Sequence, residues 1–126
     1  MEELALKILA WAATTFDWKF WLVTLAVFTQ AIVTWIYYIG AMRLVALRKS
    51  LHPIAKIVGY YGIAIGLVLD VVWNLTASVL LLDFPREFLF TSKLQRLKAD
   101  GGWRSVVAYW VCEHMLNQFD PDGKHC

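Results

Sequence analysis

The chain has 126 residues, of which 60% are hydrophobic and 17% are charged, so it is far more apolar than an ordinary soluble domain. Its formal net charge of +2 is too small to indicate a nucleic-acid partner, and its two cysteines cannot form a disulfide framework. The composition therefore predicts a small integral membrane protein with an all-α fold, and we expect the lipid bilayer to be one of its partners.

The first segment, residues 1–17, is predicted to form an amphipathic helix in the plane of the membrane. Leu4, Ile8 and Trp11 fall on one helical face, whereas Glu3 and Lys7 lie off it. The segment lacks the basic start of a cleavable signal peptide, so we expect it to stay on the chain.

Two long apolar runs follow, at about residues 20–42 and 54–84, and each is long enough to cross the hydrocarbon core of a bilayer. The connection between them is short and basic, and Pro53 suits the first turn of the second helix. A connection this short makes the two helices antiparallel. Residues 18–84 are therefore predicted to form a two-span transmembrane hairpin.

Small and polar residues recur at every fourth position of the second run, which places them along one ridge of a helix. The ridge residues are Gly62, Gly66, Asp70, Asn74 and Ser78. A carboxyl and a carboxamide find no partners among lipid chains, so we expect this ridge to face protein or a wet cavity. Its two glycines match the G-x-x-x-G motif, which lets two membrane helices approach closely.

The first run carries its own polar residues at matching depth. If the hairpin turns about Ser50, Gln30 reaches the level of Asp70, and Thr34 that of Gly66. We therefore predict a hydrogen bond between Gln30 and Asp70. Asp70 could instead join subunits or carry protons or other ions, and helix association is the favoured interpretation because lone polar residues in membrane helices commonly hold helices together.

Residues 85–126 are predicted to form basic amphipathic helices on the membrane surface, at 85–99 and 103–116, followed by a tail. The two helices are separated by Asp-Gly-Gly at 100–102, because glycine ends a helix at low cost. The basic side chains expected to bind lipid head groups are Arg86, Lys93, Arg96 and Lys98. The flanks of the first span alone favour a cytoplasmic connection, whereas all basic residues near the spans together favour cytoplasmic termini. We expect cytoplasmic termini, because the dense basic helix suits the anionic inner leaflet.

The polar residues near the C-terminus offer little chemistry. Cys112, His114, His125 and Cys126 could supply four metal ligands, but their spacing is not a standard zinc pattern, and we expect no metal. A disulfide between the two cysteines, on an oxidising side of the membrane, is the other open alternative. No catalytic set or nucleotide-binding loop is legible, so we expect neither enzymatic activity nor a cofactor.

The C-terminal third of the chain resembles a group of small membrane proteins of tailed bacteriophages and prophages. The resemblance rests on Leu-Asp-Phe-Pro-Arg-Glu-Phe at 82–88, Gly-Trp-Arg at 102–104 and Phe-Asp-Pro-Asp-Gly-Lys-His-Cys at 119–126. It implies a multi-pass protein of the bacterial inner membrane. Holin-like lysis proteins or lysis accessories are the nearest functional class, which implies a homo-oligomer. The alternatives are an adaptor whose C-terminal helices dock a host or phage membrane protein, and a narrow proton or ion pathway through Asp70.

Overall fold

A computed structural model describes residues 1–15 and 17–126, so the part of the N-terminal prediction that concerns Phe16 lies outside the described residues. Every regular element in the described part of the chain is a helix, which confirms the all-α prediction. The chain divides into two compact units, Met1–Ile32 and Val33–Cys126, and each is described by itself. The boundaries predicted at 17/18 and 84/85 stay predictions.

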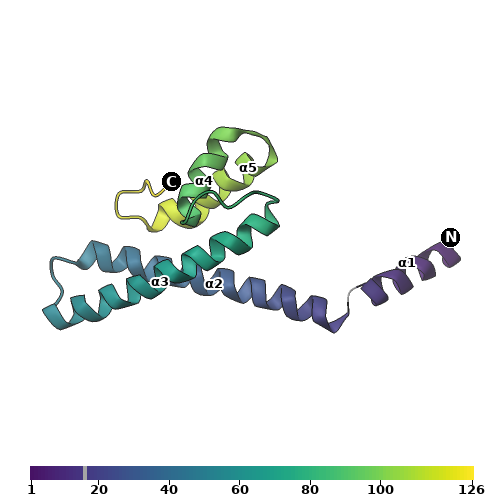
Figure 1. Ribbon diagram of the computed structural model, residues 1–126, viewed down its shortest axis with the longest axis horizontal. Coiled ribbons are helices and arrows are strands. Elements are labelled where there is room, and N and C mark those ends of the chain that lie inside the picture. The colour runs from purple at the N-terminus through teal and green to yellow at the C-terminus, as the bar shows by residue number, and fades with distance from the viewer. Residues whose placement is uncertain (16) are drawn as a thin grey trace. The chain divides into compact units, whose positions relative to one another are not determined.

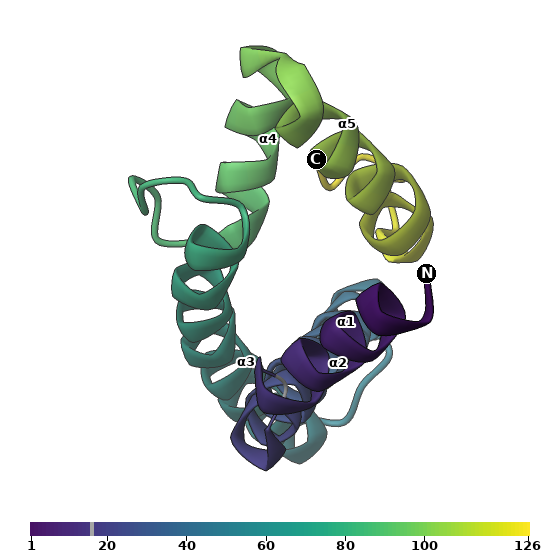
Figure 2. The same cartoon turned by 90° about the vertical axis from the view of Figure 1, so that its right-hand side faces the viewer.

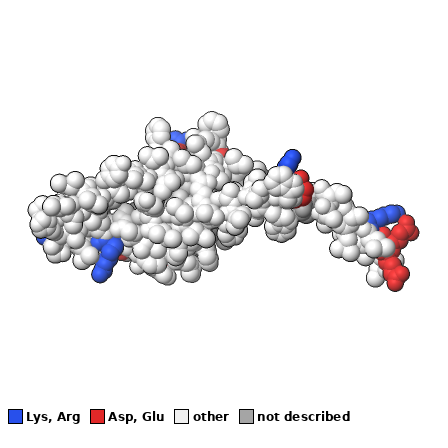
Figure 3. All heavy atoms as spheres, turned by 90° about the horizontal axis from the view of Figure 1, so that it is seen from below, with Lys and Arg blue, Asp and Glu red and all other residues white. Residues whose placement is uncertain are grey.

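The first unit contains helix α1 (Glu2–Thr15) and the N-terminal half of α2 (Trp18–Leu47). Helix α1 has no buried residue, and its Lys7–Glu3 ion pair of 2.8 Å joins successive turns on the surface. In Figure 3, acidic and basic side chains gather at the N-terminal end of α1, and most of the rest of the visible surface belongs to other residues. Helix α2 begins where Asp17 Oδ1 accepts the N–H of Phe20 at 3.1 Å, as an N-cap does.

The second unit holds the rest of α2, helix α3 (Pro53–Leu80), helix α4 (Phe90–Asp100) and helix α5 (Gly102–Val111). A π-helical turn, Cys112–Leu116, and a 3-10 turn, Asn117–Phe119, follow α5. Helix α4 lies beside the C-terminal half of α3, and α5 packs back on α4 (Figures 1 and 2). We call residues 81–126 the C-terminal module.

Two helices, α2 with 30 residues and α3 with 28, are long and apolar enough to cross a membrane. Helix α2 extends beyond the predicted run of 20–42 at both ends. Helix α3 begins one residue before the predicted run of 54–84 and stops short of its end. Helix α3 ends at Leu80 rather than at residue 84, because Leu82 takes a left-handed backbone conformation with φ of 50°. At its start, Pro53 occupies the first turn, as predicted, and His52 Nδ1 accepts the N–H of Ile54 at 3.3 Å.

The core of the second unit lies between the C-terminal module and the two long helices. Its buried members are Leu81, Leu94, Leu97, Ala108, Cys112 and Leu116. Trp35 and Tyr38 of α2 pack against this cluster, together with Phe90 of α4. Close packing of these apolar side chains holds the module against α2 and α3.

The C-terminal helices differ in their limits from the prediction. Helix α4 begins at Phe90 rather than at residue 85, and residues 85–89 form an irregular connection with a bend at 87–89, which Pro85 keeps out of the preceding helix. Gly101 and Gly102 both have φ of 76°, which confirms the break predicted at 100–102. The segment predicted as one helix at 103–116 changes from α to π geometry at Cys112.

The glycines of α3 differ in what they contact. A Cβ at Gly59 would lie 2.7 Å from both terminal methyls of Leu44, and one at Gly66 would lie 3.4 Å from Tyr37 Cδ1. A Cβ at Gly62 would meet no atom within 4 Å. Gly66 thus faces Tyr37, about one turn from the predicted Thr34, and Gly59 rather than Gly62 is the second glycine at the close approach of α2 and α3.

Candidate functional site

The polar ridge of α3 is bound by the C-terminal module of the same chain. Asp70 Oδ2 accepts the backbone N–H of Phe90 at 3.0 Å, and Phe90 is the first residue of α4. Leu89, the residue at the N-cap position, has no side-chain group to satisfy this helix end. The Asp70 carboxylate therefore caps α4 from another helix, where the partial positive charge of the helix N-terminus favours an acid.

The next two ridge residues also face the module. The side-chain amide of Asn74, which is 1% exposed, donates to the backbone oxygen of Glu87. Ser78 Oγ accepts a hydrogen bond from Lys93 Nζ and donates to the carbonyl of Asn74 at 2.7 Å. Asp70, Asn74 and Ser78, which follow one another along the ridge, thus all bind protein, as expected. The residues that cover them lie between 87 and 93.

The observed hydrogen bond of Asp70 within the second unit comes from the C-terminal module. The hydrogen bond predicted between Gln30 and Asp70 stays a prediction, because Gln30 belongs to the first unit and Asp70 to the second. Within the second unit, the Asp70 carboxylate takes its observed hydrogen bond from α4. Nothing in the sequence pattern of the two long helices pointed to this partner.

A charged cluster lies where α3 meets α4, beyond the end of the ridge. Arg96 is its centre, and its guanidinium contacts Asp83 at 2.5 Å, Glu87 at 2.5 Å and Asp100 at 3.0 Å. Lys93 lies 3.7 Å from Asp83 and is 0% exposed. Lys93 and the mostly buried Asp83, Glu87 and Arg96 thus satisfy one another, as charges taken out of water must, and the exposed Asp100 adds a surface contact to Arg96.

The ionisation of this cluster follows from its contacts. Burial would raise the pKa of Asp83, but the hydrogen bond and charge of Arg96, together with Lys93, hold it below its usual value. The hydrogen bond from Arg96 lowers the pKa of Glu87 against the effect of burial. Burial lowers the pKa of Lys93, although the charges of Asp83 and Glu87 oppose that shift. The acids are therefore held in the charged form that pairs with Arg96.

Arg104 completes the connection between the helices. Its guanidinium donates to the carbonyls of Leu81 and Leu82, each at 2.8 Å. These carbonyls follow the last turn of α3 and have no partner within that helix. Helix α3 thus caps α4 through Asp70, and α5 caps α3 through Arg104, so the three helices fix one another's ends.

The basic residues expected to bind lipid head groups have different environments. Lys93 and Arg96 are taken up in the charged cluster, and that expectation is wrong for Lys93, whose side chain is enclosed by protein. Lys98 Nζ donates to the backbone oxygen of Cys126 at 2.6 Å and lies over the ring of Tyr109. Arg86 is exposed and Lys98 is partly exposed, so the head-group prediction stays open for these two.

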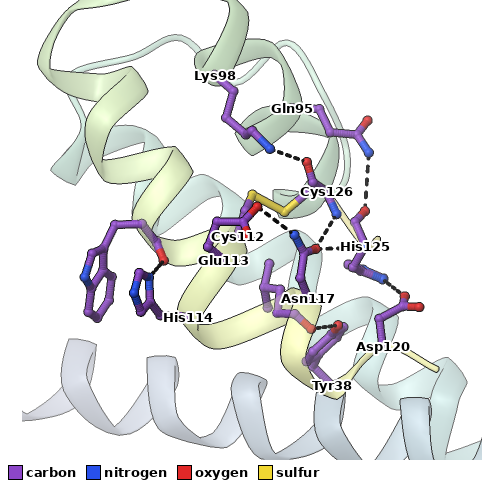
Figure 4. The surroundings of a disulfide bond; sticks show 12 residues. Tyr38, Gln95, Lys98, Cys112, Glu113, His114, Asn117, Asp120, His125 and Cys126 are labelled. Atoms are coloured by element: carbon purple, nitrogen blue, oxygen red, sulfur yellow. Dashed lines mark hydrogen bonds and ion pairs between the residues drawn. A yellow bond between two sulfur atoms is a disulfide. The ribbon is translucent and has the colours of Figure 1, made fainter. Parts of the chain in front are cut away.

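A disulfide closes the C-terminal module (Figure 4). Cys112 and Cys126 are bonded, with their Cα atoms 5.6 Å apart. Of the two alternatives for these cysteines, the structure has the disulfide, and its sulfurs are not available as thiolate ligands. The described residues contain no group of three or more His, Cys, Asp or Glu side chains arranged to hold a metal ion. His114 points away from the bond and hydrogen-bonds the carbonyl of Trp110.

Polar contacts fix the tail beside the disulfide. Asn117 Oδ1 accepts the backbone N–H groups of His125 and Cys126, at 2.8 and 3.0 Å. The ring of His125 contacts Asp120 at 2.9 Å and stacks edge-on against Tyr38 (Figure 4). The tail is therefore an ordered part of the module, as its turn-forming residues indicate.

Two aromatic residues of α2 bind the π-helical turn. Trp35 Nε1 donates to the carbonyl of Met115 at 2.9 Å, and the Tyr38 hydroxyl donates to the carbonyl of Leu116 at 2.7 Å. Because a π-helical turn interrupts the regular ladder of backbone hydrogen bonds, it leaves carbonyls that need outside donors. The polar pattern of the two long runs does not single out these aromatics; their spacing of three residues, on one face of α2, was the available signal.

A cavity of 220 Å³ adjoins the ridge at Asp70. Its walls come from α2, α3 and the module, and most of its lining is aliphatic or aromatic. Thr34 lines it, as do Gly66 and Asp70, so three of the predicted site residues meet there. Gly62 instead lines a separate hollow of 340 Å³ beside Leu44.

No protein-family model, curated protein or solved structure matches the chain.

Proposed function

We propose that the protein is a two-span integral membrane protein that acts as a membrane-embedded docking element, not as a pore or an enzyme. Helices α2 and α3 would form an antiparallel hairpin. The length and apolarity of both helices support insertion, as do their many exposed apolar side chains. The charged cluster supports it too, since its charges are paired within the chain and would not oppose contact with lipid.

The observation that carries this proposal is the occupation of the α3 ridge. A channel or lesion needs polar side chains that face water. Asp70, Asn74 and Ser78 are each hydrogen-bonded to the module, so lining a pore with them would require the module to leave. This favours the adaptor interpretation over the holin-like one and over an ion pathway through Asp70.

The docking face we propose is the outer side of α5. Trp103, Val106, Tyr109 and Trp110 are each more than half exposed there, on a helix whose other side packs on α4. Aromatic residues of this kind supply much of the energy at protein interfaces. A membrane-embedded helix of a partner, whether a host protein, a phage protein or a second copy, is the ligand that such an apolar face would take.

We propose the orientation from the disulfide. Disulfides persist in oxidising compartments, so the module would face away from the cytoplasm, on the periplasmic side in a bacterial cell. The connection with Arg48 and Lys49 would then be cytoplasmic, in agreement with the positive-inside rule as applied to the first span. Lys93 and Arg96, which weighted the sequence count toward cytoplasmic termini, are neutralised by acids of the module.

Two measurements in bacteria test this proposal. Alkaline phosphatase fused after Cys126 should be active, and green fluorescent protein fused at the same place should not fluoresce, because the C-terminus would be periplasmic. Green fluorescent protein inserted between Lys49 and Ser50 should fluoresce. Induced expression should leave the membrane potential intact. A bright C-terminal fluorescent fusion would overturn the orientation, and an abrupt loss of potential that Asn74→Leu prevents would establish the lesion-forming alternative instead.

A further inference from the structure

The cavity beside Asp70 has features of a ligand site that the docking function does not use. It lies between the C-terminal half of α2, the middle of α3, and residues 89–91 and 125 of the module. Its apolar walls include Ala41, Val45, Ile63 and Leu67. Its volume of 220 Å³ exceeds the roughly 150 Å³ of an apolar protein cavity that accommodates benzene.

A few polar groups converge on this apolar space. Thr34 is only 7% exposed, and its Oγ1 has no hydrogen-bond partner among the residues that the structure describes. Asp70 is held in place by the N–H of Phe90, which occupies Oδ2. His125, held by Asp120, forms part of the opposite wall. Apolar walls with a small number of fixed polar groups are typical of small-molecule sites.

The unpartnered hydroxyl of Thr34 is the observation that points to a ligand. Leaving a buried hydroxyl without a hydrogen bond costs about 1–3 kcal/mol, and a bound polar group would recover that cost. Water is a poor candidate to fill the whole cavity, because each buried water needs two to four polar partners and most of this lining is apolar. A molecule with an apolar body and one polar end fits both parts of the wall.

We propose that this cavity binds a small amphiphile, with an apolar body about the size of one aromatic ring and an amine or hydroxyl head that hydrogen-bonds Thr34 and Asp70. An ammonium head has donors for both Asp70 and Thr34, whereas a hydroxyl head would donate its one O–H to Asp70 and accept the O–H of Thr34. An ammonium head would add attraction to the carboxylate of Asp70. The site goes beyond the proposed docking function and holds for either orientation of the chain in the membrane.

The test uses the full chain in lipid nanodiscs, with three probes of the same body. 2-Phenylethylamine and 2-phenylethanol carry the two possible heads, and ethylbenzene carries none. Titrations are followed through the amide shifts of Phe90 and Thr91, which adjoin the cavity. We expect saturable binding of at least one headed probe, with ethylbenzene about fivefold weaker or more, as the loss of one buried hydrogen bond implies.

Two variants and one control locate the binding. Thr34→Val keeps the shape and removes the unpaired hydroxyl, so it should fold normally and weaken the headed probe about fivefold, while Asp70 still binds the head. Ala41→Leu fills the cavity and should abolish binding of all three probes. Thr24→Val removes a hydroxyl of α2 that bonds the carbonyl of Phe20, and Thr24 is not among the residues lining the cavity, so this variant should bind as the wild type does. Equal shifts in wild type, Thr34→Val and Ala41→Leu, or shifts that never saturate, would mean partition into lipid only and would overturn the proposal.

Discussion

The carboxylate of Asp70 accepts the backbone N–H of Phe90 at 3.0 Å, so a residue in the middle of a long apolar helix caps the first turn of another helix. This contact explains an acid at a position where a lipid-facing helix would not tolerate one. It also sets where α4 starts, because Leu89 has no side chain that could cap the helix.

Replacing Asp70 should therefore affect α4 before it affects α3. We expect Asp70→Ala to lower the free energy of unfolding by about 1 kcal/mol, the usual value of an N-cap. Asp70→Asn keeps an acceptor oxygen for Phe90 and should lose less. Thermal unfolding in a nonionic detergent measures both, and hydrogen exchange at Phe90 should accelerate most in the alanine variant. If Asn and Ala proved equally destabilising, the charge rather than the capping contact would be what matters.

Stability should fall in acid because of the cluster around Arg96. The pKa of Asp83 and of Glu87 is lower in the folded chain than in the unfolded one, so unfolding takes up protons in the acid range. The free energy of unfolding then rises with pH in that range. The contribution should be complete above about pH 5 and decline progressively below about pH 4.

The measurement for this prediction is the unfolding midpoint as a function of pH in a nonionic detergent. Glu87→Gln removes one acid of the cluster and should make the acid decline shallower. Glu2→Gln, on exposed α1 and outside the cluster, is the matched control and should leave the profile as it is. A wild-type midpoint that is constant between pH 3 and pH 6 would contradict the assigned ionisation.

Reducing the disulfide should loosen the module. The bond closes a segment with a sequence separation of 14, for which the loss of chain entropy in the unfolded state corresponds to about 3 kcal/mol. We expect reductant to lower the thermal midpoint of the wild-type protein and to expose Cys126 to alkylation. The double variant Cys112→Ser with Cys126→Ser should start lower and no longer respond to reductant. An unchanged wild-type midpoint after complete alkylation would contradict a stabilising role.

The two glycines near the crossing of α2 and α3 should respond differently to the same substitution. Gly59→Leu places its Cβ against Leu44, whereas a Cβ at Gly62 meets open space beside a hollow. We expect Gly59→Leu to destabilise the protein by about 1–3 kcal/mol through overpacking. Gly62→Leu should be neutral or stabilising by up to about 1 kcal/mol, since leucine favours a helix over glycine. Thermal unfolding of the pair checks the order, and the reverse order would exclude this packing.

The sequence was informative where one helix determines the outcome by itself. Periodicity and composition predicted the long helices, the start at Pro53, the break at 101–102 and the polar ridge of α3. The sequence did not predict what the α3 ridge binds. The same polar residues would suit α2, a second subunit or the module. Asp70 caps α4, and Arg104 caps α3. Each of these contacts joins residues 20 or more positions apart, and no local pattern encodes such pairs.

Charged residues illustrate the same limit. A basic amphipathic helix normally binds lipid head groups, and the pattern from 85 to 99 predicts that function. The acids that pair with Lys93 and Arg96 come from the connection before α4 and from its last residue, Asp100. Only the fold places Asp83 and Glu87 close enough to neutralise that helix.

The most direct test of the account is a crosslink from position 93 in the membrane. A photoreactive lysine analogue replaces Lys93, and light and heavy isotope-labelled chains are expressed together, so that crosslinks within one chain differ in mass from those between chains. We predict crosslinks from position 93 to Ser78 and its neighbours in the last turn of α3, joining light to light and heavy to heavy only. Mixed light–heavy crosslinks to α3 would mean that a second copy covers the ridge, and an absence of crosslinks to α3 would mean that the module does not cover it at all.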